Sequence, residues 1–243
     1  MQFPDHIIYR GYSAPVRIEA DVQDLEVIGT IPNELNGAYY RNSADPTYPP
    51  LLGKDIFLNG DGMVHMVRFD NGHADLKTRY VRTRKFELER KARRALFGAY
   101  RNSFTDSAEV AGEDNNTANT SMLWHHGKLY ALKESGRPYE LDPATLATLG
   151  ERDFNGQLHS KTFTAHPKLD PRHWRMPSLR LQHRRRGQQR HRTADDLTAR
   201  RHHAPRNSQS TLLLDGARLP GVQEPHRLRH LPHGLRLGTG STR

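Results

Sequence analysis

The sequence contains no cysteine, so it can form neither a disulfide framework nor a thiolate metal site. This absence is typical of proteins that work in a reducing compartment. No stretch approaches the roughly 18 consecutive apolar residues of a membrane-spanning helix, and the first residues lack the basic and apolar regions of a secretory signal. We therefore predict a cytoplasmic protein without a transmembrane segment.

Lysine is missing from residues 172–243, which contain 16 Arg, eight His and only four acidic residues. Phe, Tyr and Ile are missing there as well, whereas residues 1–171 hold 21 Lys plus Arg against 23 Asp plus Glu. The formal net charge of +10 therefore arises entirely after residue 171. With so few bulky apolar side chains, residues 172–243 cannot offset the entropy of ordering a chain. We predict a folded part over residues 1–171 and a disordered basic tail over residues 172–243.

Residues 1–171 are dominated by short alternating or apolar stretches that end in Gly, Pro, Asn or Asp, which is the pattern of strands and hairpins. The predicted strands are LEVIGTIP, GAYYRN, GMVHMVRFDNG, LKTRYVRTRKF, MLWHHGKLYALKE and KTFTAHP. The triplets at Asp70–Gly72 (DNG) and His125–Gly127 (HHG) predict tight turns. Only Phe86–Tyr100 has the apolar spacing of a helix. The pattern predicts an all-β fold with one inserted helix, and leaves a sandwich, a barrel and a propeller open.

Six motifs follow one another in the folded part. They are GAYYRNSADP (37–46), NGDGMVHMVRF (59–69), RYVRT (79–83), ANT (118–120), GKLYALKESGRPYELDPATLATLG (127–150) and FTAHPKLDP (163–171). In this order they resemble the N-terminal motifs of the carotenoid cleavage oxygenase superfamily, and most closely its lignostilbene dioxygenase-like members. The resemblance runs from about Arg17 to Pro171 and ends there. It implies that residues 1–171 are the incomplete N-terminal part of a seven-bladed β-propeller.

The activity implied by the resemblance is that of a non-haem Fe(II) dioxygenase, which cleaves a conjugated C=C bond with O2 to give two carbonyl products. In this family four histidines hold the iron, and neutral imidazole suits Fe(II). His166, in FTAHPKLDP, resembles the first of these ligands. Glu134, in ALKES, resembles a glutamate that fixes the second ring nitrogen of an iron-bound histidine. Without the family context, Glu134 is equally well explained as a carboxylate paired with Arg137.

Two further residues bear on the substrate. Tyr100, in LFGAYRN, and Lys133, in ALKES, resemble the pair that contacts the phenol oxygen of a stilbene in lignostilbene dioxygenase-type members. A lysine beside a phenol favours phenolate character, which pushes electron density into the bond that reacts. The alternatives are an exposed strand lysine and a tyrosine packed at the end of a helix. Leu58 lies where such relatives often have phenylalanine. A phenolic stilbene is thus the first predicted substrate, and an apocarotenoid is the second.

Three other histidines are not expected to bind iron. His65 lies between Val64 and Met66 in an alternating strand, and His125 and His126 lie at the predicted HHG turn, where polar residues belong by default.

The tail after Pro171 does not continue the resemblance. Reading degenerate codons for residues 172–190 one nucleotide later permits ATGECHSFGYNTGGEASND, which resembles the expected continuation. The same offset over residues 215–231 permits MVHDFLVSKNHIVFAIF, which resembles the segment with the second iron histidine. We therefore interpret residues 172–243 as a frameshifted product and expect a chain with one identifiable iron ligand to be inactive and poorly soluble. The alternative is a basic nucleic-acid-binding protein that uses the arginines of the tail, although such a protein should also contain lysine and stacking aromatic residues.

Overall fold

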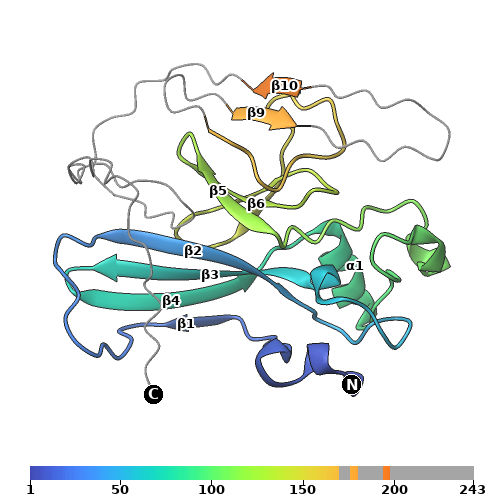
Figure 1. Ribbon diagram of the computed structural model, residues 1–243, viewed down its shortest axis with the longest axis horizontal. Helices are drawn as coiled ribbons and strands as arrows, with labels where there is room; N and C mark the ends of the chain where they lie inside the picture. The colour runs from blue at the N-terminus through green and yellow to red at the C-terminus, as the bar shows by residue number, and fades with distance from the viewer. Residues whose placement is uncertain (170–175, 180–193, 198–243) are drawn as a thin grey trace, which may run out of the picture.

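The computed structural model describes residues 1–169, together with the backbone of residues 176–179 and 194–197. Two four-stranded antiparallel sheets make up most of it, with one α-helix at an end of the first sheet (Figure 1). The prediction of an all-β fold with one inserted helix is therefore confirmed for the described residues. The number of blades and the closure of a propeller stay predictions.

The first sheet has the strand order β1-β4-β3-β2. Its strands are β1 (Ala20–Val22), β2 (Gly37–Asp45), β3 (Asp61–Asp70) and β4 (His73–Tyr80). The DNG turn joins β3 to β4 as expected, because Asn71 and Gly72 adopt φ values of 49° and 84°, which a two-residue hairpin turn of this kind requires. The long β2–β3 pair places Asp45 directly opposite Asp61 at one end of the sheet.

The second sheet has the order β5-β6-β7-β8. Its strands are β5 (Ser121–His125), β6 (Lys128–Leu132), β7 (Tyr139–Leu141) and β8 (Thr148–Glu151). The HHG turn is confirmed with a smaller extent, since His126 and Gly127 form the turn whereas His125 is the last residue of β5. A bulge at Glu140 and Leu141 shifts the register between β7 and β8.

The helix α1 spans Arg84–Ala92, so the predicted extent of Phe86–Tyr100 is wrong at both ends. Thr83 accepts a hydrogen bond from the Phe86 N–H at 3.2 Å and starts the helix at Arg84, two residues earlier than predicted. Arg93 adopts a left-handed conformation (φ 57°) and ends it. The apolar residues that continue the helical spacing, Leu96 and Phe97, are buried in a loop. Single turns of 3-10 helix form at Ile7–Tyr9, Gly11–Ser13, Phe57–Asn59, Ser103–Thr105 and Ala108–Val110.

Two predicted strands are wrong. LEVIGTIP (25–32) and KTFTAHP (161–167) contain no strand. In the first segment, the alternation does not correspond to burial, because Ile28 is almost fully exposed. In the second, Phe163 and Ala165 pack on the second sheet without pairing to it. Within residues 172–243, β9 (Met176–Leu179) and β10 (Ala194–Leu197) pair antiparallel, and the disordered tail stays a prediction. The rest of that prediction lies outside the described residues.

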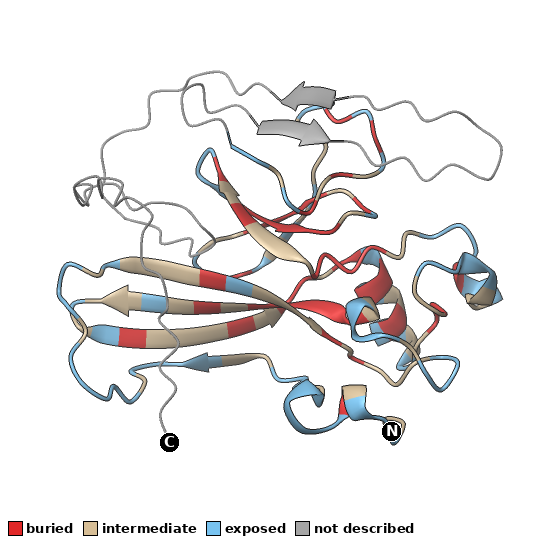
Figure 2. Cartoon of the chain, viewed as in Figure 1, coloured by how far each residue is buried: buried red, intermediate tan, exposed pale blue. Residues whose placement is uncertain are grey.

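The largest apolar cluster lies between the two sheets. It is formed by Tyr40, Val64, Met66, Val81, Ala118, Leu129, Ala131, Tyr139, Leu141 and Leu146. The Tyr40 hydroxyl also donates to the Pro143 carbonyl at 2.7 Å, which ties the sheets together. Buried residues gather as well on α1 and the adjoining end of β3 (Figure 2). At that end the loops around Leu58, Tyr100 and Thr117 meet the end of β6.

Candidate active site

Lys133 directly follows β6 and is almost entirely buried, with 5% of its surface exposed. The expectation of an exposed strand lysine, which was the alternative to a substrate contact, is therefore wrong. The Lys133 Nζ donates to the Thr117 Oγ1 at 2.5 Å and to the Leu58 carbonyl oxygen at 3.3 Å. Burial, and then the nearby positive charge of Lys85, lower the pKa of Lys133 to about 8, against the carboxylates of Glu134 and Asp61, which raise it.

Tyr100 lies beside Lys133, so the structure brings together the two residues that the sequence paired. The Lys133 Nζ is 5.4 Å from the centre of the Tyr100 ring, which is within cation–π distance. Tyr100 lies in a loop beyond α1 and is half-buried. Its backbone N–H donates to the Asp55 Oδ1 at 3.2 Å.

Asp55 and two asparagines hold the loops that carry this pair. The Asp55 Oδ2 accepts a hydrogen bond from the Asn59 side chain at 2.5 Å, and the same amide donates to the Gly98 carbonyl at 3.0 Å. The Asn119 amide donates to the Leu58 and Gly60 carbonyl oxygens at 2.9 and 2.6 Å. The Leu58 carbonyl is thus shared by Asn119 and Lys133. The sequence analysis assigned no role to these three residues, although Asn59 and Asn119 lie within the NGDGMVHMVRF and ANT motifs.

His166 and Glu134 also lie close together. The His166 Nε2 is 3.8 Å from the Glu134 Oε1, a distance longer than a hydrogen bond but within the range of an ion pair. The imidazole is largely exposed, whereas the Glu134 carboxylate is two-thirds buried. The alternative pairing of Glu134 with Arg137 is wrong, because Arg137 pairs with Glu151 at 3.5 Å and donates to the Ser160 carbonyl.

The described residues do not complete a metal site. Among residues 1–169, no group of three or more His, Asp or Glu side chains is arranged to hold a metal ion. His166 alone, with Glu134 behind it, does not fit a centre with four histidine ligands. The described residues by themselves therefore do not support a chemical step at a metal.

The histidines that were not expected to bind iron lie elsewhere. His65 is half-buried in β3, where its Nε2 lies 3.1 Å from the Ser43 hydroxyl, and burial lowers its pKa. His125 is buried, although a polar turn position was expected for it. Burial, and then the neighbouring ring of His126, lower the pKa of His125 to about 4. These residues are structural parts of the two sheets.

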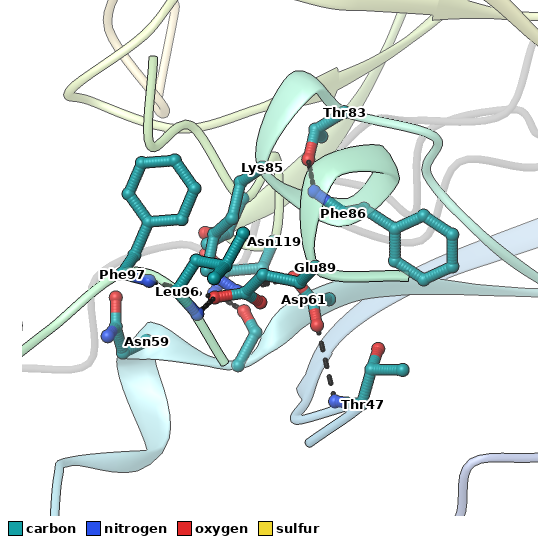
Figure 3. Close-up of polar contacts among 12 residues, drawn as sticks. Thr47, Asn59, Asp61, Thr83, Lys85, Phe86, Glu89, Leu96, Phe97 and Asn119 are labelled. Carbon is teal, nitrogen blue, oxygen red and sulfur yellow. Dashed lines mark hydrogen bonds and ion pairs between the residues drawn. The ribbon is translucent and has the colours of Figure 1, made fainter. Parts of the chain in front are cut away.

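A buried ion network lies next to the site (Figure 3). The Lys85 Nζ donates to the Asp61 Oδ1 at 2.8 Å and to the Glu89 Oε2 at 2.7 Å, and all three side chains are almost fully buried. Burial opposes the charge on Lys85, but the two carboxylates outweigh it and raise its pKa. The other oxygen of Glu89 accepts the N–H groups of Leu96 and Phe97 at 2.9 and 3.1 Å. The four-residue spacing of Lys85 and Glu89 was the available sequence signal.

The fold and these residues define a carotenoid oxygenase type of scaffold. The chain belongs to the carotenoid oxygenase family, because the family model described as retinal pigment epithelial membrane protein matches residues 13–212. The lignostilbene-like resemblance is also confirmed: the chain is 50% identical over 169 residues to resveratrol cleavage oxygenase 1 of Aspergillus fumigatus, covering 70% of this chain and 34% of that protein. It is 48% identical over 169 residues to lignostilbene-alpha,beta-dioxygenase isozyme III of Sphingomonas paucimobilis, with the same coverage.

A solved structure supports the same relationship. The crystal structure of Pseudomonas brassicacearum lignostilbene dioxygenase superposes with a TM-score of 0.71 and 47% identity, covering 74% of this chain and 37% of that chain. The chain thus spans about a third of the length of the curated relatives it matches. In the part of the chain that the structure describes, no helix has the length and apolar character needed to span a bilayer.

Proposed function

We propose that residues 1–171 form the phenol-binding part of a stilbene-cleaving oxygenase. The observation that carries this proposal is the buried ammonium of Lys133 beside the ring of Tyr100. A buried lysine needs a compensating partner, and this one has two neutral oxygen acceptors rather than a carboxylate within hydrogen-bond distance. The relatives whose names refer to resveratrol and lignostilbene share about half of the aligned residues.

Lys133 would act on the phenol oxygen. Two of its three N–H groups are directed to Thr117 and Leu58, which leaves the third for a ligand. With a pKa of about 8, Lys133 is mostly protonated at neutral pH. A protonated amine beside a phenol lowers the pKa of the phenol and favours the phenolate. The phenolate then donates electron density to the conjugated double bond, while Tyr100 orients the aromatic ring.

Iron enters the proposal through the resemblance alone. Bound Fe(II) would activate O2 for cleavage of the double bond into two carbonyl products, with His166 as one of four ligands and Glu134 orienting its imidazole. An apocarotenoid is the second candidate substrate. Since one ligand of four lies in the described residues, we propose that this chain binds a phenol without cleaving it.

Fluorescence titration of the full chain with a hydroxystilbene and with its methyl ether tests the phenol site. We expect Lys133→Met to weaken hydroxystilbene binding about tenfold, because a charged hydrogen bond contributes about 1.5 kcal/mol. The methyl ether should bind weakly to both proteins. Lys161→Met, at an exposed lysine, is the matched control. Equal loss of affinity in the two variants would contradict the phenol site.

We further propose that the reading frame changes after Pro171. The alignments with the curated relatives, which cover about 70% of the chain, are compatible with this proposal, whereas the family match extends to residue 212. Sequencing the DNA around codons 170–173 tests this directly. A repaired chain should bind Fe(II) and convert a hydroxystilbene faster than an apocarotenal. Conversion of the apocarotenal alone would contradict the role of Tyr100 and Lys133, and an intact frame would contradict the account of the tail.

Nucleic-acid binding remains the alternative from the sequence. It depends on arginines whose side chains lie outside the described residues, and no contact in the described part favours it.

A further inference from the structure

Residues 96–100 lead from α1 to Tyr100, and side chains rather than a neighbouring strand hold their backbone. Each of the five consecutive N–H groups donates to a side-chain oxygen. The acceptors are Glu89 for Leu96 and Phe97, at 2.9 and 3.1 Å (Figure 3), Asp106 for Gly98 at 2.8 Å, Thr105 for Ala99 at 2.8 Å, and Asp55 for Tyr100 at 3.2 Å. Three of these four acceptors are carboxylates, which accept stronger hydrogen bonds than neutral oxygens do. The position of Tyr100 therefore depends on where the acceptors lie.

The four acceptors differ in how far along the chain they lie from the loop. Glu89, Thr105 and Asp106 lie only six to eight residues from the N–H groups that they bind, so they set the shape of the loop. Asp55 lies 45 residues from Tyr100. It therefore sets where the loop lies relative to the rest of the site.

Two links between this loop and the turn at Phe57–Asn59 depend on Asp55. The Asp55 Oδ1 accepts the Tyr100 N–H, and the Oδ2 accepts a hydrogen bond from the Asn59 side-chain amide at 2.5 Å. The same amide donates to the Gly98 carbonyl oxygen at 3.0 Å. Because an amide group has two N–H donors in a fixed plane, binding one of them to Asp55 orients the other toward Gly98.

The same turn carries an acceptor for Lys133. The Leu58 carbonyl oxygen accepts a hydrogen bond from the Lys133 Nζ at 3.3 Å. The Asp55 Oδ1 also accepts the Ile56 N–H at 2.8 Å, directly before the turn. Asp55 thus binds the backbone of Tyr100 and holds the turn that contacts Lys133. The distance of 5.4 Å between the Lys133 Nζ and the centre of the Tyr100 ring depends on both contacts.

We propose that Asp55 is a positioning residue that sets the spacing of Tyr100 and Lys133, and thereby makes the site selective for a phenol over its methyl ether. This inference rests on the proposed phenol site. A ligand ring in contact with Tyr100 brings its oxygen to the third N–H of Lys133 only at a matching spacing, since hydrogen bonds weaken steeply with distance and angle. Beside the ammonium group a phenol can ionise, whereas a methyl ether has no proton to lose. When the spacing is lost, the two ligands should bind alike.

Fluorescence titration of the full chain with a hydroxystilbene and with its methyl ether measures the ratio of the two affinities. We expect a ratio of about ten in the unmodified chain and of at most about two in Asp55→Ala. Asp55→Asn should give a ratio of about four, because its amide oxygen still accepts the Tyr100 N–H but its nitrogen cannot accept a hydrogen bond from Asn59. Partial unfolding would lower both affinities equally, so the ratio reports on the spacing.

Asp142→Ala is the matched control. The Asp142 carboxylate also accepts two backbone N–H groups, those of Ala144 and Thr145 at 3.0 and 2.7 Å, but it follows β7 at the end of the second sheet away from Lys133. Its ratio should equal that of the unmodified chain. An unchanged ratio in Asp55→Ala, or an equal fall in Asp142→Ala, would overturn the role of Asp55 alone. Equal affinities for the two ligands in the unmodified chain would instead refute the phenol site, and the role of Asp55 with it.

Discussion

Lys133 is a buried cation without a carboxylate in hydrogen-bond contact, and this combination makes its protonation costly. Its folded pKa of about 8 lies below the value of about 10.4 for an exposed lysine. Where the folded pKa is the lower one, the unfolded chain binds more protons between the two values. The free energy of unfolding should therefore rise as the pH increases from about 8 to about 10.4, and the charged form destabilises the fold below pH 8.

Lys133→Met removes this dependence. At pH 7 we expect the variant to be more stable by about 2–3 kcal/mol, and the difference from the unmodified chain should shrink as the pH rises to about 10. Urea unfolding of both proteins at several pH values measures the difference in their free energies of unfolding. Tyrosines that titrate in the same pH range contribute equally to both proteins, so their contributions cancel in the difference. A difference that stays constant with pH would mean that Lys133 is neutral or solvated in the fold.

We propose that Thr117, which accepts a hydrogen bond from the Lys133 Nζ, positions Lys133. Thr117→Val keeps the shape of the side chain and removes the acceptor, so the single remaining hydrogen bond, to the Leu58 carbonyl, no longer fixes the direction of the other N–H groups. We expect hydroxystilbene affinity to fall about fivefold, corresponding to about 1 kcal/mol, and the Lys133 pKa to fall below 8. Thr117→Ser should restore both. A positioning role should shift the midpoint of the pH dependence of hydroxystilbene binding. A general loss of stability would leave that midpoint unchanged.

At the scale of elements, both an ion network and apolar contacts join α1 to the end of β3. Lys85 bridges Asp61 of β3 and Glu89 of the helix, and Glu89 also binds the two N–H groups of the loop that leads to Tyr100. The ion network therefore connects the helix, the first sheet and the loop that leads to Tyr100. Replacing one member leaves a buried charge without its partner.

Glu89→Gln should destabilise the fold by about 3 kcal/mol, measured by urea unfolding, because removing one partner of a buried ion pair costs about 3–5 kcal/mol and the amide keeps part of the hydrogen bonding. Glu87→Gln, at an exposed position in the same helix, is the control and should change stability by less than about 0.5 kcal/mol. Equal effects of the two substitutions would show that the network contributes nothing beyond surface charge.

At the scale of the whole molecule, the apolar clusters of the described residues and all the proposed site residues lie before residue 170. Deleting residues 172–243 should therefore leave hydroxystilbene affinity within about twofold of that of the full chain. Retention on a polyanion column should disappear in the same variant, since exposed arginines bind phosphates without specificity and in a salt-dependent way. Loss of hydroxystilbene binding on deletion would show that residues 172–243 contribute to the site.

The residue pattern alone determined the β-rich class and both hairpin turns, because turn chemistry and strand alternation are local. The pairing of Tyr100 with Lys133 came from the family resemblance of their motifs. The tertiary structure decided what depends on distant partners. It placed Leu96 and Phe97 in a loop instead of a helix, since the carboxylate of Glu89 binds their N–H groups. It also buried Lys133 against Thr117 and Leu58. Burial and the choice of hydrogen-bond partner arise only when segments far apart in the chain meet.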